Sequence, residues 1–337
     1  MADFDYRKYY LSEEESERIF RRRIVPREIA GKAEPVDRPV AVFVTAQPGA
    51  GKTQLTEAVV ESLADSGGCV QINSDTYKPH HPKWHQLLAE DDVTAAPYTS
   101  ADGRRWMAKA EAYSAEHRLN VVLETTVRDP SVFREPIDRL RAAGYRIEIA
   151  ALAVPEATSQ MGILSRYAQQ VQDKGSGRLT EQSNHDESYR LMAEAIARED
   201  AHPTVDALSL WRRDNQLLYS NVVEDGHWVA PAAAGQVLDA ERSRQWTYPE
   251  AVAFLGDVDA MAARLPPELQ PRLDRVRAAS QTNLPPGASA AHRAAHSYPQ
   301  VARPFDRSAP AAGRYEAVLQ ERHSDPRHLF GSSGSGR

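Results

Sequence analysis

The feature that most constrains this chain is a short apolar run that leads into a turn with two glycines. Residues 41–45 are apolar or β-branched, Gly49 and Gly51 follow, and a helical pattern covers residues 53–63. The run predicts a buried strand. Glycines allow backbone N–H groups to approach an anion closely, and the start of a helix attracts negative charge. A strand, a glycine turn, Gly-Lys-Thr at residues 51–53 and a helix together predict a phosphate-binding loop.

Each side chain of this loop has an expected role. Lys52 is a mobile cation that reaches the β- and γ-phosphates of ATP, and the hydroxyl of Thr53 is placed to ligate Mg²⁺. Ala46 stands where such loops usually begin with glycine, and its small side chain still fits. An ordinary glycine turn before a helix is the alternative interpretation. We expect the nucleotide to bind at Gln47, Pro48, Gly49, Ala50, Gly51, Lys52 and Thr53.

Composition and charge limit the class of protein. The chain has 337 residues, of which 41% are hydrophobic and 26% charged, as in one large or two modest globular domains. The net charge of −6 argues against a general nucleic-acid binder. The single cysteine, Cys69, excludes an internal disulfide framework and favours a reducing cytosol. No apolar stretch is long enough to span a membrane and the acidic start lacks a signal core, so we expect a cytoplasmic protein without membrane contact.

Strands and helices alternate along the first two thirds of the chain. Apolar runs at residues 69–72, 120–128 and 146–154 predict further strands, separated by helical stretches. This alternation predicts an α/β fold in which helices cover both faces of a parallel sheet. Residues 205–211 and 216–222 predict a β-hairpin that closes this unit.

The two ends of the chain differ from this middle part. Ser12 and Glu15 predict a helix start, and Pro26 is expected to end that helix. Residues 247–265 predict one or two helices, and the Pro-, Ala- and Arg-rich chain beyond Pro266 is expected to bury little and to be partly disordered. The chain therefore divides into an N-terminal helical segment, a nucleotide-binding domain and a partly helical extension, at residues 1–38, 39–228 and 229–337.

Charged side chains follow two of the predicted strands. In open α/β sheets, ligand-binding residues collect at the carboxyl ends of strands. Asp75 is therefore placed to face the γ-phosphate, although a helix cap is an equal alternative. Glu124 occupies a position near Mg²⁺ or the acceptor, and Arg128 is suited to bidentate phosphate binding. A Glu–Arg surface pair is the alternative for these two residues.

Two arginines flank a glycine-rich loop at residues 175–178. Arg166 precedes this loop and Arg178 ends it, after the fourth predicted strand. The pattern is typical of a lid whose cations neutralise charge on a γ-phosphoryl group, and plain surface arginines are the alternative.

Residues 79–105 are rich in proline, histidine and aspartate. The spacing of its histidines does not match a zinc site and no cysteine assists them, so we favour a substrate-side loop over a metal site. A helix is expected after this loop, at about residues 103–116.

Taken together, the motifs resemble the zeta toxin family of kinases, over about residues 40–225. The matching segments are the phosphate loop at residues 46–53, Asn73–Lys78 with His81-Pro82, Val122–Arg128, Ala153–Pro155, Arg166-Tyr167, and Gly177-Arg178 followed by His185-Asp186.

The resemblance implies a P-loop kinase-like fold and a reaction. ATP with Mg²⁺ would phosphorylate the 3′-hydroxyl of the sugar in UDP-N-acetylglucosamine and so block the synthesis of cell-wall precursors. Asp75 would be the base that accepts the hydroxyl proton. Lys52, Arg166 and Arg178 would stabilise transition-state charge. Acceptor binding would involve Asp75, Glu124, Thr126 and Arg128, and a separate small antitoxin is implied as a partner.

The sequence departs from the family pattern on the acceptor side. Thr125 replaces a glycine of the family's Glu-Gly-Thr segment, and Glu111 is a candidate for an expected acidic substrate residue. Two alternatives therefore stay open. One is a kinase for another hydroxyl substrate, such as another nucleotide sugar, a dinucleotide or an antibiotic. The other is a non-catalytic, ATP-dependent regulatory protein that recruits a partner through its C-terminal extension.

Overall fold

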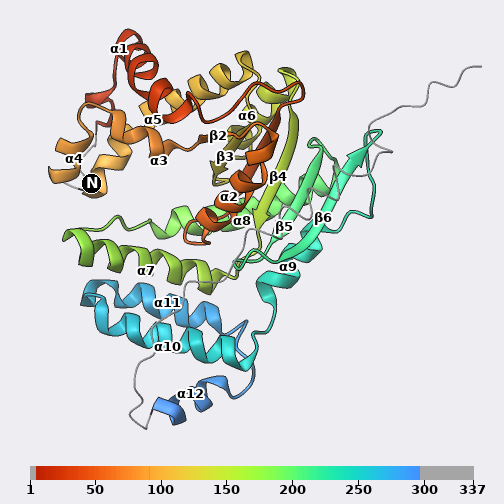
Figure 1. Ribbon diagram of the computed structural model, residues 1–337. Helices are drawn as coiled ribbons and strands as arrows, with labels where there is room; N and C mark the ends of the chain where they lie inside the picture. The colour runs from red at the N-terminus through yellow and green to blue at the C-terminus, as the bar shows by residue number, and fades with distance from the viewer. Residues whose placement is uncertain (1–4, 91, 297–337) are drawn as a thin grey trace, which may run out of the picture.

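One mixed sheet organises the structure. The computed structural model describes residues 5–90 and 92–296. Within these residues the strands form a seven-stranded sheet in the order β2-β3-β1-β4-β5-β6-β7 (Figure 1). The first five strands are parallel, and β6 and β7 are antiparallel additions. The strands are β1 (Val40–Thr45), β2 (Val70–Ile72), β3 (Val121–Thr125), β4 (Arg146–Leu152), β5 (Ala207–Trp211), β6 (Leu217–Glu224) and β7 (His227–Trp228).

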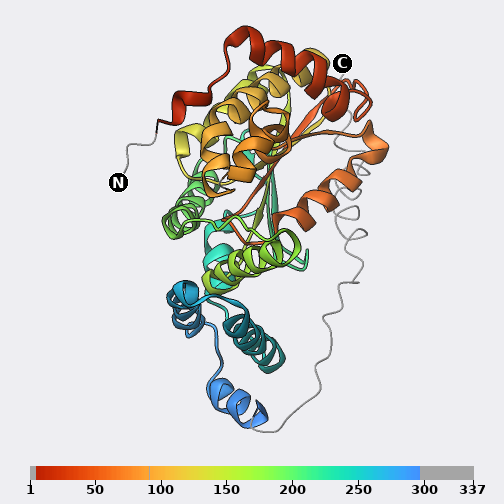
Figure 2. The ribbon, with the colours of Figure 1, turned by 90° about the vertical axis from the view of Figure 1, so that its left-hand side faces the viewer.

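Helices connect the parallel strands and cover both faces of the sheet. The connection from β1 to β2 runs along the sheet in the opposite direction to the other connections. Because such crossovers are right-handed, α2 lies on one face and the later connecting helices on the other, as Figure 2 shows for α2 and α5. The predicted α/β class and the terminal hairpin are confirmed. The helices of this part are α2 (Lys52–Ser62), η3 (Ala64–Ser66), α3 (Ser74–Tyr77), η4 (Lys78–His80), α4 (Trp84–Glu90), α5 (Asp92–Glu116), α6 (Pro130–Ala142), α7 (Glu156–Lys174) and α8 (Gln182–Ala201).

The central strand β1 is buried on both sides, which fixes the position of the loop that follows it. Phe43 is 1% exposed and meets Phe133 of α6 edge-on, with ring centroids 6.2 Å apart. Val44 and Ala46 are fully buried. Strands packed on both faces read as continuous apolar runs, which is why this run was recognisable in the sequence.

The N-terminal helices begin as predicted but end later. After η1 (Tyr6–Tyr9), α1 (Glu13–Ile19) is capped by Ser12, whose hydroxyl accepts a hydrogen bond from the Glu15 amide. The helix then widens into the π-helix η2 (Phe20–Ile29), which runs through Pro26. The predicted end at Pro26 is therefore wrong. A π turn bonds residues five apart, so it changes the hydrogen bonds and spacing that a proline disrupts in an α-helix.

Residues 78–116 are largely helical, so the predicted loop at residues 79–105 is wrong. Helix α5 begins at Asp92, eleven residues before the start we expected. It packs beneath the N-terminal helices, where the indole N–H of Trp106 donates to the carbonyl oxygen of Ser16 at 3.1 Å. Tertiary packing of this kind overrides a weak local signal.

The extension also differs from the expectation. It contains α9 (Ala234–Ser243), α10 (Tyr248–Arg264), η5 (Pro267–Leu269), α11 (Gln270–Ser280) and α12 (Ala288–His296). Leu273 and Val276 of α11 are fully buried in a cluster with Leu164 of α7. The expectation that the chain beyond Pro266 buries little is therefore wrong up to residue 296, and later residues lie outside the described part of the chain. None of the described helices is both long and apolar enough to cross a membrane.

Candidate active site

The predicted phosphate-binding loop lies between the carboxyl end of β1 and the start of α2. Its two glycines have positive φ angles, 80° at Gly49 and 93° at Gly51, which residues with a side chain rarely adopt. Gly51 is the residue before the first turn of α2, whose unpaired N–H groups face the loop. The loop therefore presents the helix terminus at which phosphates bind.

Helix α7 packs directly on this loop through its own glycine, Gly162. A Cβ atom on Gly162 would lie 2.2 Å from the carbonyl oxygen of Gly49, and one on Gly49 would lie 2.0 Å from the carbonyl oxygen of Ser159. Arg166 lies one helical turn after Gly162 and so shares its face. The close approach of the two backbones thus brings Arg166 toward the loop.

We expect Gly162→Ala to destabilise the protein by about 1–3 kcal/mol, because the added methyl group overlaps a backbone oxygen that cannot move freely. The matched control is Gly256→Ala in α10, where the new Cβ meets nothing within 4 Å. Alanine is the better helix former, so this control should stabilise the protein by roughly 0.5–1 kcal/mol. Denaturant unfolding of both variants measures the difference, and equal stabilities would contradict the close packing.

Lys52 lies against the loop at the start of α2. Its Nζ atom donates to the carbonyl oxygen of Ala46 at 2.9 Å. The pKa of Lys52 is lowered to about 8, mainly by burial; Glu124 and Asp75 oppose this shift and Arg166 adds to it. The lysine, one arginine and two carboxylates predicted from separate segments are thus close enough to act on one another.

Asp75 lies in the first turn of α3, directly after β2. Its Oδ1 atom accepts from Lys78 Nζ at 2.7 Å and from Arg178 Nη1 at 3.3 Å. Burial raises the pKa of Asp75, but Lys78 and Arg178 outweigh it, and the net shift is downward. The carboxylate is ionised and its side chain stays 61% exposed toward the site. Lys78 was missed as a site residue, although its spacing of three from Asp75 places both on one helix face.

The two arginines predicted to form a lid lie close enough for their charges to interact. Burial lowers the pKa of Arg166, and the positive charge of Arg178 lowers it further. The Nη2 atom of Arg166 donates to Thr180 Oγ1 at 2.9 Å, and the backbone N–H of Arg178 donates to Gln170 Oε1 at 2.8 Å. Two guanidinium groups that repel each other beside a phosphate loop form a site that favours an anion.

The acceptor-side residues lie at the end of β3 and just after it. Glu124 is the neighbour of Val44 in the sheet register, and its charge acts on Lys52. Thr126 is half-buried just after the strand. Arg128 is exposed, and its Nη1 atom donates to Asn184 Oδ1 of α8 at 3.3 Å. Glu124 therefore joins the cluster around Lys52, whereas Arg128 lies toward α8 with a neutral partner.

The side chain of Gln47 turns away from the loop. It is fully buried, donates to the carbonyl oxygen of Val154 at 3.0 Å and accepts from Arg242 Nη2 at 3.5 Å. Arg242 belongs to α9, and its guanidinium lies 3.7 Å from the centroid of the Tyr189 ring. Gln47 thus offers a nucleotide its main chain alone, and its side chain joins the phosphate loop to the C-terminal extension.

A serine, a histidine and an aspartate form a chain of hydrogen bonds behind the loop. Ser159 Oγ lies 2.8 Å from His185 Nε2, and His185 Nδ1 lies 3.0 Å from Asp186 Oδ1. Ser159 and His185 are fully buried, and burial lowers the pKa of His185. A serine without access to a substrate cannot act as a nucleophile, so this set holds α7 against α8.

Two of the histidines at residues 79–105 that we considered as metal ligands have partners within the fold. His80 Nε2 lies 2.9 Å from Glu28 Oε1, and His81 Nε2 lies 3.1 Å from the carbonyl oxygen of Tyr9. Within the described residues, no three His, Cys, Asp or Glu side chains gather into a metal-binding group. Glu111 is buried and pairs with Arg139 Nη2 at 2.6 Å, so its carboxylate already has a partner within the fold.

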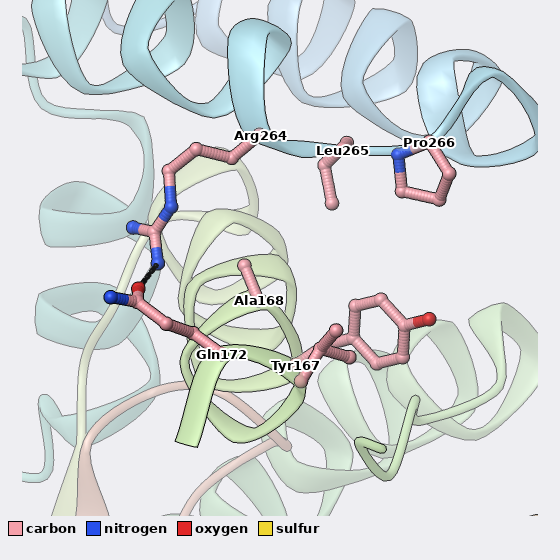
Figure 3. Close-up of a pocket in the computed structure, with 7 residues that line it drawn as sticks. Tyr167, Ala168, Gln172, Arg264, Leu265 and Pro266 are labelled. Carbon is pink, nitrogen blue, oxygen red and sulfur yellow. Dashed lines mark hydrogen bonds between the residues drawn. The ribbon is translucent and has the colours of Figure 1, made fainter. Parts of the chain in front are cut away.

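A separate groove of about 450 Å³ lies between α7 and the end of α10 (Figure 3). Tyr167, Val171 and Leu265 are among its lining residues, and Arg264 Nη2 donates to Gln172 Oε1 at 3.0 Å beside it. None of its lining residues belongs to the phosphate loop or carries one of the predicted catalytic groups.

Comparison with known proteins identifies the family. The sequence profile of the family described as "Zeta toxin" matches residues 27–224. The chain belongs to the zeta toxin family. This match includes the phosphate loop, Asp75, Glu124, Arg166 and Arg178, and it ends before the extension. The family membership inferred from the sequence motifs is therefore confirmed.

Individual zeta toxins are distant relatives. The toxin zeta of Streptococcus pyogenes is 30% identical over 201 residues, which cover 58% of this chain and 67% of that protein. The toxin zeta of Enterococcus hirae is 29% identical over 194 residues, which cover 56% of this chain and 65% of that protein. The chain thus spans about two thirds of the length of these relatives.

The fold is shared with a solved structure from a toxin-antitoxin system. A structure described as part of the PezAT chromosomal toxin-antitoxin system of Streptococcus pneumoniae superimposes with a TM-score of 0.61 at 18% identity. The match covers 80% of this chain and 98% of that one. It therefore supports the P-loop kinase-like fold over the described sheet and most of the surrounding helices.

Proposed function

We propose that this protein is an ATP-dependent phosphotransferase that phosphorylates a hydroxyl group. The observation that carries the proposal is the cluster of Lys52, Arg166 and Arg178 around the exposed carboxylate of Asp75, at the mouth of a phosphate-binding loop. Phosphoryl transfer needs cations where charge spreads over the γ-phosphoryl oxygens and a group that accepts the proton of the attacking hydroxyl. These four side chains supply both.

Each residue has a distinct task in this reaction. Lys52 holds the β- and γ-phosphates, and Arg166 and Arg178 neutralise the transferred group. An anion between the two arginines relieves their repulsion, so nucleotide binding competes with Asp75 for Arg178. Release of that ion pair leaves the Asp75 carboxylate free to accept the hydroxyl proton.

The side chains beside Lys52 suit Mg²⁺. Thr53 is exposed on the first turn of α2, and the carboxylates of Asp75 and Glu124 act on the neighbouring Lys52. Hydroxyl and carboxylate oxygens are the ligands this ion prefers, with phosphate and water completing its shell. Thr53 would hold the ion, which when bound neutralises charge on the β- and γ-phosphates.

The acceptor we propose is the 3′-hydroxyl of the sugar in UDP-N-acetylglucosamine. Membership of the zeta toxin family supports it, and Glu124 at the end of β3, next to β1, is followed by Thr126 and Arg128 on the acceptor side. Thr125 in place of the family's glycine is the reason to test other hydroxyl substrates in parallel. Phosphorylation of this sugar nucleotide would block cell-wall precursor synthesis, and the substrate is one that a cytoplasmic enzyme would meet.

The decisive experiment is mass spectrometry of UDP-N-acetylglucosamine incubated with the purified protein, ATP and Mg²⁺. A gain of one phosphoryl group, absent with Lys52→Met, is the expected result. A panel of other nucleotide sugars, dinucleotides and aminoglycosides is incubated in the same way. If only one of these other compounds were phosphorylated, the proposed acceptor would be wrong but the proposed kinase activity would stand. ATP binding without any product would favour the regulatory alternative.

We also propose a separate small antitoxin as the partner. The superimposed structure of the Streptococcus pneumoniae protein is described as part of a toxin-antitoxin system, which supports this for a chain of the same family. Among the described residues of the extension, apolar side chains of α10 and α11 pack on α7.

A further inference from the structure

The turn between β5 and β6 is fixed against the start of the phosphate-loop helix. Asn215 Nδ2 donates to the carbonyl oxygen of Gln54 at 3.3 Å, and Asn215 itself is 4% exposed. On the other side of the turn, Arg212 forms two hydrogen bonds with Glu241 of α9, at 2.9 and 2.7 Å. The turn is thus held rigidly beside α2.

Arg213, at the tip of this turn, lies across the phosphate loop. A Cβ atom built on Gly51 would be 3.2 Å from Nε and 3.5 Å from Cγ of Arg213. The guanidinium group therefore borders the loop beside the residue that opens α2. The pKa of Arg213 is lowered by burial, and Asp257 of α10 opposes that shift. Asp75 and Glu124 do not contribute, so Arg213 stands apart from the cations around Asp75.

The position of Arg213 corresponds to one end of a bound nucleotide. The γ-phosphate must lie toward Lys52 and Asp75, because phosphoryl transfer takes place there. The α-phosphate and nucleoside must then leave the loop past the first turn of α2, where the β5–β6 turn is fixed. A guanidinium at that place offers a flat face to a base and donors to ribose or α-phosphate oxygens.

We propose that Arg213 binds the nucleoside half of the nucleotide by stacking its guanidinium plane on the base. This inference rests on the proposed nucleotide-dependent function. It makes the β5–β6 turn a contributor to the nucleotide site, because Arg213 borders Gly51 at the start of α2. The turn then influences nucleotide binding without touching the reacting atoms.

The test compares two ligands by isothermal titration calorimetry with the full chain. ADP has a nucleoside, and inorganic tripolyphosphate has none. Arg213→Lys keeps the positive charge but removes the flat guanidinium, so ADP should bind about five- to tenfold more weakly while tripolyphosphate binds within about twofold of the parent. In turnover assays, Arg213→Lys should raise the KM for ATP and leave kcat nearly unchanged.

Arg190→Lys is the matched control, because it makes the same substitution at an exposed arginine of α8 whose guanidinium pairs with Glu194. It should leave the affinity for ADP unchanged. Equal affinities of the parent and Arg213→Lys for ADP would overturn the inference, and so would an equal loss for ADP and tripolyphosphate, which would assign Arg213 to the phosphates. A parent protein that binds neither ligand would overturn the proposed function itself, and the inference with it.

Discussion

Asp75→Asn should lower kcat by a factor of about 10²–10⁴, because the amide keeps the shape of the carboxylate but cannot accept the proton of the attacking hydroxyl. Nucleotide binding should persist, since Lys52 and both lid arginines are unchanged. Loss of the carboxylate also frees Arg178 from its 3.3 Å contact with Asp75. The affinity for ADP should therefore stay equal or increase. Steady-state kinetics and calorimetry on the same preparation measure the two quantities.

The matched control for this variant is Asp65→Asn, which removes an exposed carboxylate from η3 and should leave kcat unchanged. Because the pKa of Asp75 lies below its ordinary value, the carboxylate is ionised at every pH above about 5. Protonation of Asp75 should therefore not reduce kcat in that range. If Asp75→Asn retained more than about a tenth of the parental kcat, another group would have to accept the proton.

The phosphate loop and Asp75 were predictable because their signals are local. A buried strand, two glycines and a helix start specify the loop within thirteen residues, and the geometry of Gly49 and Gly51 follows from the same short stretch. Asp75 was placed by topology, since a side chain after a parallel strand faces the same edge as the loop. The structure adds that Lys78 of η4 and Arg178 of the loop between α7 and α8 both hold this carboxylate.

The supports behind the loop were not predictable because they join distant segments. Gln47 bonds to a residue 107 positions later and to another 195 positions later. The glycine at position 162, inside α7, is explained by the carbonyl oxygen of Gly49, which leaves no room for a Cβ atom. No periodicity or spacing in a single sequence identifies such pairs. The same holds for α11: its sequence is mostly polar and charged, so its composition does not indicate that Leu273 and Val276 are buried on α7.

Lys52→Met should abolish turnover and at the same time stabilise the nucleotide-free protein. A cationic side chain that binds the transferred phosphate raises the rate by a factor of about 10²–10³, because it acts where transition-state charge develops. In the folded protein, burial lowers the pKa of Lys52 from its ordinary 10.5 to about 8, so the fold disfavours the ammonium form. At pH 7 this cost is fully present, and a methionine of similar length removes it. The gain should be on the order of 1–2 kcal/mol after loss of the hydrogen bond to Ala46.

The sign of this effect makes it testable by pH. Between about pH 8 and 10.5 the unfolded chain keeps the Lys52 proton and the folded protein does not, so the stability of the parent rises with pH through that interval. The advantage of Lys52→Met should therefore shrink toward pH 10, whereas Lys32→Met, at an exposed lysine, should show no advantage at either pH. Guanidinium unfolding of all three proteins at pH 7 and pH 10 measures this, and a Lys52→Met variant less stable than the parent at pH 7 would show that the lysine is not disfavoured.

Above pH 8 the affinity of the parent for ADP should also fall by about tenfold per pH unit, because each binding event must then return one proton to Lys52. A site that weakens the apo fold to keep a half-buried cation ready for phosphate would show both dependences together.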